Sequence, residues 1–171
     1  MNIISVGSAL ASSDFVVKPR SGNFCHIDGP AVQFPRLFVP EGIRVFETEN
    51  KVSKYLHLMI TDDTTLAFIK TMEDKVDPAG KNFASSLSKR TFKLKIDPLK
   101  TEVFDEEGTQ IECDFVKNQF ERCTVAVTAR PTLVYYFGDR CGMTWNVERM
   151  HVWGETKELT RKAMDDFDFD M

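Results

Sequence analysis

The sequence predicts a mainly β protein with one amphipathic helix and an acidic C-terminal tail. Residues 122–153 carry three runs in which apolar and polar residues alternate, as they do in half-buried strands. One stretch, residues 62–77, has the spacing of an amphipathic helix. Fourteen Phe, three Tyr and two Trp in 171 residues can fill one hydrophobic core. We therefore expect one folded domain over residues 1–154 and a flexible tail over residues 155–171.

The three β-rich runs also predict which side chains face the core. In the first run, alternation leaves Arg122 and Arg130 outside. It turns four side chains inward: Cys123, Val125, Val127 and Ala129. Tyr135 and Tyr136 are neighbours in the second run, so alternation buries only one of them. In the third run the apolar parity changes after Glu148, which predicts a β-bulge or a strand that changes sheets.

The helix has its own start and stop signals. Asp62 or Asp63 can cap its first turn, and Pro78 ends it. The apolar residues between them recur every three or four positions: Leu66, Ile69, Met72 and Val76. This spacing buries one face of the helix.

The segments before the helix predict short strands and a basic loop. Residues 1–14 are small and polar, and we interpret them as an arm that can form an edge strand. Residues 15–30 predict a strand, a loop with Lys18 and Arg20, and a short strand. The apolar run at residues 54–60 predicts a buried strand.

After the helix comes the most basic part of the chain. Residues 81–100 hold six basic residues against one acidic residue, Asp97. Residues 91–96 alternate, so Lys93 and Lys95 share the outer face of a strand. Such a face can follow a phosphate backbone, although lysines also protect exposed edge strands from aggregation.

The net charge of −4 is concentrated at the C-terminal end. Four of the last seven residues are Asp165, Asp166, Asp168 and Asp170. Without them the 26 acidic residues fall to 22, equal to the 22 basic residues, so the body of the chain is neutral overall. A neutral body leaves room for a local basic surface.

The sequence carries none of the common catalytic, metal or membrane signatures. The four cysteines form no CxxC pair, and no run approaches the ~18 apolar residues of a membrane span. We therefore expect no membrane association and a reducing, intracellular compartment. The spacing of Cys113, Cys123, Cys141 and His151 matches no usual zinc pattern. With no P-loop, GxGxxG or HExxH motif, we expect no cofactor, no metal and no enzyme.

The C-terminal half resembles a family of DNA-binding proteins. The resemblance rests on an acidic-Gly hairpin (VFDEEGTQI), a long strand (RCTVAVTARPTLVYYFG), a closing strand (MTWNVERMHVW) and an acidic tail with aromatic residues. Together, over residues 91–171, these segments resemble the OB-fold single-stranded DNA-binding proteins of short-tailed phages and large DNA viruses. The resemblance implies a five-stranded barrel with additional strands and one helix. It also implies a groove lined by aromatic and basic residues, and a tail that occupies this groove and recruits replication enzymes.

We therefore expect largely sequence-independent binding of single-stranded DNA during viral replication or recombination, at the replication site of an infected host cell. Seven residues are expected to contact phosphates: Lys18, Arg20, Lys93, Lys95, Arg122, Arg130 and Arg140. Tyr135 or Tyr136, together with Trp145, are expected to stack on bases. The tail residues expected to bind a polymerase, helicase or primase are Asp165, Asp166, Phe167, Asp168, Phe169 and Asp170. A homodimer is also compatible with the sequence.

Two other classes of function compete with this interpretation. One is a β-barrel interaction or structural protein that does not bind DNA and uses its acidic tail for docking. The other is a small metal-dependent enzyme.

Overall fold

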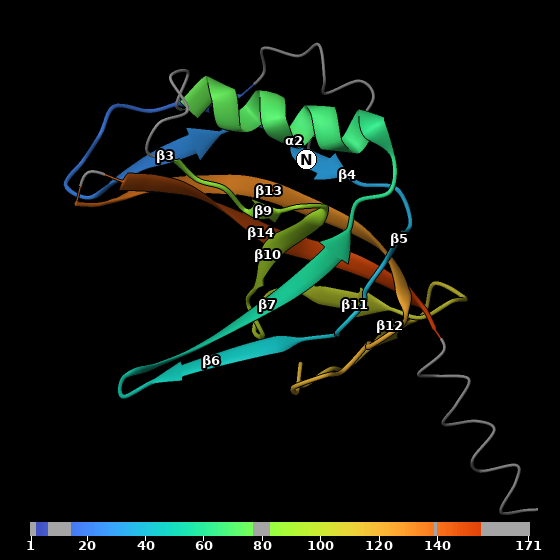
Figure 1. The fold of residues 1–171 in the computed structure, drawn as a ribbon. Coiled ribbons are helices and arrows are strands. Elements are labelled where there is room, and N and C mark those ends of the chain that lie inside the picture. Colours follow the sequence, from blue (N-terminus) through green and yellow to red (C-terminus); the bar gives the residue numbers. More distant parts are fainter. Residues whose placement is uncertain (1–2, 7–14, 77–82, 139, 155–171) are drawn as a thin grey trace, which may run out of the picture.

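The computed structural model describes residues 3–6, 15–76, 83–138 and 140–154 (Figure 1). Within them the protein is mainly β with a single long helix, as the sequence predicts. The acidic tail, with all six of its candidate residues, lies outside the described residues.

Five strands pair in a ring. They are β5 (Leu37–Phe38), β7 (Lys51–Met59), β10 (Thr91–Ile96), β13 (Thr124–Phe137) and β14 (Arg140–Trp153). The pairing runs β13, β5, β7, β10, β14 and back to β13, with β10 and β14 parallel and the other pairs antiparallel. The ring is thinnest at β5, where only Phe38 pairs with Met59. This ring with one helix confirms the predicted OB-fold-like architecture.

Shorter strands extend the ring at several edges. They are β1 (Ile3–Ser5), β2 (Val16–Val17), β3 (Phe24–Asp28), β4 (Ala31–Gln33), β6 (Arg44–Thr48), β8 (Phe83–Ala84), β9 (Leu87–Ser88), β11 (Glu102–Phe104) and β12 (Gln110–Ile111). Strand β1 pairs with β4, which confirms an edge strand in the N-terminal arm. The predicted acidic-Gly hairpin is β11 and β12, and Gly108 turns it with a φ of 84°.

The hairpin of β13 and β14 runs through the whole molecule (Figure 1). The four side chains predicted to face inward from its first run are all buried. Thr128 pairs with Arg149 and Ala129 pairs with Val147, so Glu148 is skipped in the register. The predicted bulge is therefore present at Glu148, and it explains why the apolar parity changes there.

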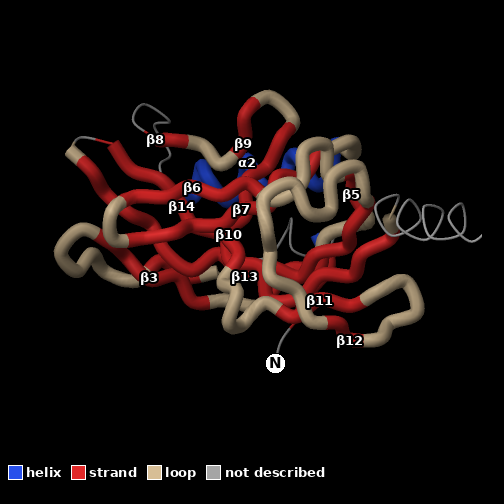
Figure 2. Tube along the Cα trace, turned by 90° about the horizontal axis from the view of Figure 1, so that it is seen from below, coloured by secondary structure: helices blue, strands red, loops and turns tan. Residues whose placement is uncertain are grey.

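Helix α2 (Asp63–Val76) lies over one side of the strands. Its cap is Asp62, whose carboxylate accepts hydrogen bonds from the Thr65 backbone N–H at 2.9 Å and the Thr65 hydroxyl at 2.6 Å. Phe68, Ile69 and Met72 point into the core. Figure 2 looks at the molecule from below Figure 1, and there the helix lies behind the strands of the ring.

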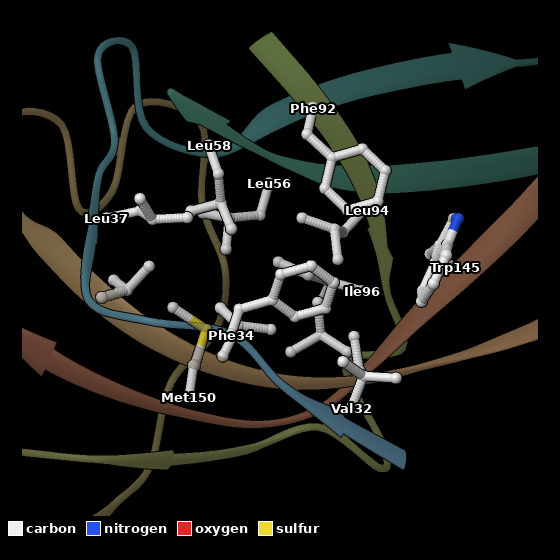
Figure 3. Close-up of a cluster of buried hydrophobic side chains, with 14 of the residues drawn as sticks. Val32, Phe34, Leu37, Leu56, Leu58, Phe92, Leu94, Ile96, Trp145 and Met150 are labelled. Atoms are coloured by element: carbon white, nitrogen blue, oxygen red, sulfur yellow. The ribbon is translucent and has the colours of Figure 1, made fainter. Parts of the chain in front are cut away.

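Aromatic side chains form the centre of the core. Phe34 lies 5.8 Å from Phe92, 6.2 Å from Phe68 and 5.9 Å from Trp145, measured between ring centroids. Figure 3 shows Phe34 among aliphatic side chains of the ring strands, with Trp145 beside it on β14. Only 1% of Trp145 is exposed. Burial of such large rings stabilises the fold, at about 25 cal/mol for each Å² removed from water.

Candidate nucleic-acid interface

An aromatic and cationic surface covers the outer side of β7 and β10. Alternate residues of both strands are buried, so the residues between them face outward. Tyr55 is the register partner of Lys95, and His57 is the partner of Lys93. The Lys93 ammonium lies 4.9 Å from the centre of the Tyr55 ring. The strand predicted at residues 54–60 is therefore present, but the prediction that it is buried holds for one face only. Its other face points outward.

Three more aromatic side chains extend this surface. Phe46, which is 50% exposed, lies edge-on to Tyr55 with a centroid distance of 5.6 Å. On β13, the rings of Tyr135 and Phe137 stack 5.6 Å apart with an angle of 18° between their planes. We call the resulting surface the platform, and its members are Phe46, Tyr55, Lys93, Lys95, Tyr135 and Phe137.

A glycine in the neighbouring strand positions Tyr135. Tyr135 pairs with Gly142, and a Cβ added at Gly142 would stand 2.4 Å from the Cζ and Oη atoms of the tyrosine. The ring can therefore lie across the backbone of β14 only because this position has no side chain.

The platform is hollowed between its two tyrosines, at the point where β10 and β14 separate. These strands pair only at Lys95 and Ile96 of β10. Before that point Ser86 bridges them, because its carbonyl accepts from the Lys93 N–H at 2.9 Å and its hydroxyl donates to the Met143 carbonyl at 3.2 Å. The hollow has a volume of ≈ 90 Å³, and Trp145 is among the residues that line it.

Positive charge is crowded on and beside the platform. Burial lowers the pKa of His57, and the neighbouring charges of Arg44 and Lys93 lower it further. Burial also lowers the pKa of Lys95, and Lys51 adds to this effect. An anion placed here would relieve the repulsion among these cations. The surface therefore combines aromatic rings with a cluster of positive charges that a bound anion would stabilise.

Four of the residues predicted to bind DNA lie on or beside the platform. Lys93, Lys95 and Tyr135 belong to it, and the Arg140 guanidinium carbon lies 5.8 Å from the centre of the Phe137 ring. Tyr136 points to the other side of β13, where its hydroxyl lies 3.5 Å from the Cys25 sulfur. Both tyrosines are half-buried, so the prediction that only one of them is buried is wrong, and only Tyr135 lies on the platform.

The prediction that Trp145 stacks on bases does not fit its position. The side chain is buried in the core, where its ring meets Phe34, Phe68 and Phe92 edge-on at 5.5 to 5.9 Å. Neither face of such a ring is open to a nucleobase. Trp145 alternates with Met143 and Val147 along β14, and all three side chains are buried.

The four other predicted cations lie away from the platform, and three of them have protein partners. Lys18 forms an ion pair with Asp28 at 2.9 Å, and the Arg20 guanidinium lies 4.0 Å from the centre of the Tyr136 ring. Arg130 pairs with Glu148 at 2.9 Å and also donates to the Gly29 carbonyl. Arg122 is exposed at the opposite end of β13 from Tyr135.

Sequence reasoning missed Phe46, Tyr55 and Phe137. The signal for Tyr55 was present in the sequence KYLHLM, where Tyr55 and His57 alternate with Leu56 and Leu58. The apolar character of the whole run hid this alternation. Phe46 had no such signal, because its place beside Tyr55 depends on the pairing of β6 with β7.

The described residues give no sign of a metal centre or a membrane-crossing helix. Within them, no three His, Cys, Asp or Glu side chains are grouped as metal ligands would be. The Cys113 thiol instead lies 3.2 Å from the side-chain oxygen of Gln119, and Cys123 is buried. No helix in this part of the chain is long and apolar enough to span a bilayer.

The fold has counterparts among solved structures. The single-stranded DNA-binding protein from bacteriophage Enc34, in complex with ssDNA, matches with a TM-score of 0.51 and 12% identity, over 84% of this chain and 97% of that one. The chain shares the fold of this phage protein. A C-terminal truncation of the Enc34 protein matches with a TM-score of 0.52 and 11% identity, over 82% of this chain and 95% of that one. No protein-family model matches the sequence, and no curated protein does either.

Proposed function

We propose that this protein binds single-stranded DNA on the platform, without strong sequence preference and without catalysing a reaction. The observation that carries the proposal is the row of exposed and half-buried aromatic rings interleaved with lysines across β6, β7, β10 and β13. Ring faces accept any base by stacking, and lysines neutralise the backbone between the bases. The shared fold with a phage protein that was solved with ssDNA supports the same conclusion.

The geometry suggests how a strand would be held. Bases would stack on Phe46, Tyr55, Tyr135 and Phe137, and each stack would contribute about 1–3 kcal/mol. Phosphates would lie near Lys93 and Lys95, with Arg140 at the end beside Phe137. Four further cations are proposed to contribute less to phosphate binding, because three of them already have protein partners. They are Lys18, Arg20, Arg122 and Arg130.

A titration with labelled oligo(dT), followed by fluorescence anisotropy at several salt concentrations, tests this proposal. Binding that weakens steeply as salt rises is expected, because bound lysines release counterions from the phosphates. An oligo(dT) that fails to bind at low salt would contradict the proposal. In that case the protein would belong to the interaction proteins that do not bind DNA.

We further propose that the tail regulates this surface in the replication or recombination of a viral genome. Residues 165–171 hold four carboxylates around two phenylalanines, which offer the charge and the ring faces that a short strand offers. A tethered segment acts at an effective concentration near millimolar, so it would compete with DNA and be released for a polymerase, helicase or primase when DNA binds.

Deletion of residues 165–171 tests the tail. The truncated protein is expected to bind oligo(dT) more tightly, most clearly at low salt, where carboxylate contacts are least screened. A variant that keeps the length but replaces the four aspartates with serine serves as the control for charge. Unchanged or weaker binding by both proteins would leave the tail as a docking or solubility segment. The homodimer remains a separate prediction, which sedimentation equilibrium can test.

A further inference from the structure

A buried hydrogen-bond donor lies beneath the platform without a partner. Trp145 is 1% exposed, and its indole N–H finds no hydrogen-bond acceptor among the residues that the structure describes. A buried polar group left unpaired costs about 1–3 kcal/mol, so such groups call for an explanation. In Figure 3 the nitrogen lies at the end of the ring turned away from Val32 and Phe34.

The donor belongs to a residue that lines the hollow between the two tyrosines. Tyr55, Tyr135, Lys93 and Lys95 surround this hollow, and Trp145 lines it from the core side. It exists because β10 and β14 pair only near Lys95 and separate before it. Its volume of ≈ 90 Å³ is several times the ~10–15 Å³ that one water requires by the same measure. The hollow is large enough for water, but the indole nitrogen itself has almost no accessible surface, so a ligand group has to open the contact around the N–H to reach it.

The lining selects the chemistry of the ligand. The indole and the two ammonium groups only donate hydrogen bonds, and the hydroxyl groups in the lining can donate or accept. Donors therefore outnumber acceptors, so a group that presents acceptors is favoured. Burial and the charge of Lys51 lower the pKa of Lys95, so an acceptor at this lysine is favoured further. A DNA strand presents acceptors on its base edges, as carbonyl oxygens and ring nitrogens, and on its phosphates. The rings of Tyr55 and Tyr135 at the rim favour a base, because a base can stack on them while its edge reaches inward.

We propose that the hollow receives the carbonyl edge of a thymine, with the Trp145 N–H as the buried donor. This inference rests on the proposed function and refines it, because it assigns one position of the bound strand a base preference. Thymine presents two carbonyl acceptors, whereas the N1 and N7 acceptors of adenine flank an amino donor that would face the lysines and the indole. The binding of DNA stays largely independent of sequence, with a modest preference for thymine at this position.

The test compares oligo(dT), oligo(dA) and an abasic oligomer, each about 8 nucleotides long, on the full-length protein and on Trp145→Phe. The variant keeps a ring in the core and deletes only the N–H group and part of the indole. Its affinity for oligo(dT) is expected to fall about 3- to 10-fold, the effect of one lost hydrogen bond, while oligo(dA) and the abasic oligomer are unaffected. Phe92→Leu serves as the matched control, because it also changes a buried ring against Trp145 but removes no polar atom.

Four outcomes decide the proposal. A loss confined to oligo(dT) supports it. An equal loss for all three oligomers overturns it, because the indole would then act through a phosphate or through the fold. If the parent protein binds none of the oligomers, the proposed function fails, whereas equal binding of oligo(dT) and oligo(dA) by the parent overturns only this inference.

A second measurement uses the unaltered protein, in case Trp145→Phe folds poorly. Oligo(dT) with one thymine replaced by 4-thiothymine or 2-thiothymine carries a poorer acceptor at one carbonyl position. A sliding series of single replacements is expected to reveal one sensitive position in the bound strand. Equal affinity across the series would contradict a base carbonyl in the hollow.

Discussion

The ring of Tyr135 lies across Gly142, so close that a Cβ at this glycine would stand 2.4 Å from the tyrosine Cζ and Oη atoms. Gly142→Ala should therefore displace the far end of the tyrosine and weaken binding of oligo(dT). In a Tyr135→Ala background the same substitution should have no further effect, because the clash has been removed. A double-mutant cycle measures this coupling, and additive losses would show that the two residues act independently.

Lys93 and Lys95 are expected to contact phosphates. Replacing both with Ala should lower the slope of log K against log salt by about 0.7 for each lost contact, evenly across sequences. Lys70 and Lys75 are exposed on helix α2, and replacing both gives a control with the same change in net charge. If the two double variants have equal slopes, the platform lysines act only through the overall charge.

The rings of the platform are expected to contribute more to DNA binding than to stability, since none of them is fully buried. Tyr55→Ala and Phe137→Ala should each weaken binding by about 1–3 kcal/mol for every stack that is lost. Phe104, which is half-buried on β11 and pairs with His151 far along β14 from Gly142, provides a control ring off the platform. Trp145→Ala should instead lower the free energy of unfolding by about 3–5 kcal/mol, because it empties a site in the core. Thermal and chemical unfolding measure the effect of each substitution on stability, and DNA titrations of the same variants measure its effect on binding.

Binding should be coupled to the protonation of His57. In the free protein the pKa of His57 lies below 6.5, because burial and the charges of Arg44 and Lys93 disfavour its cation. A phosphate nearby would raise this pKa, so the complex would bind more protons than the free protein does. The affinity for DNA should therefore rise as pH falls from about 8 to about 5. Stability of the free protein should change in the opposite direction, because the unfolded chain binds the proton more readily below about pH 6.5.

His57→Gln isolates this residue from the other histidines. In the variant, affinity for oligo(dT) should depend less on pH, and the free energy of unfolding should fall less at low pH. If affinity for oligo(dT) in the parent protein stays constant or falls over this range, His57 lies too far from the bound phosphates to sense them.

Much of the fold follows from patterns that are local in the sequence. The alternation of Phe92, Leu94 and Ile96 turned Lys93 and Lys95 outward, and the parity change after Glu148 marked the bulge. These predictions succeed because strand geometry alone decides the direction of each side chain. The same rule buries Trp145, and its assignment to base stacking failed because residue type was given more weight than alternation.

The site itself depends on contacts between distant segments. Phe46, Tyr55 and Tyr135 come from three strands, and their proximity follows from how β6, β7, β10, β13 and β14 pair. No local pattern states which strands become neighbours. The hollow likewise arises where β10 and β14 separate around Ser86, which is a consequence of tertiary packing.

Photo-crosslinking tests most directly whether the platform is the DNA-binding surface. Oligo(dT) substituted with 5-iodouracil would be irradiated with the full-length protein, and the crosslinked residues would be mapped by mass spectrometry. Crosslinks to Tyr55, Tyr135, Phe46 or Phe137, competed by unlabelled oligo(dT), are the predicted result. Competed crosslinks confined to Phe104, to helix α2 or to other residues away from the platform would contradict the account.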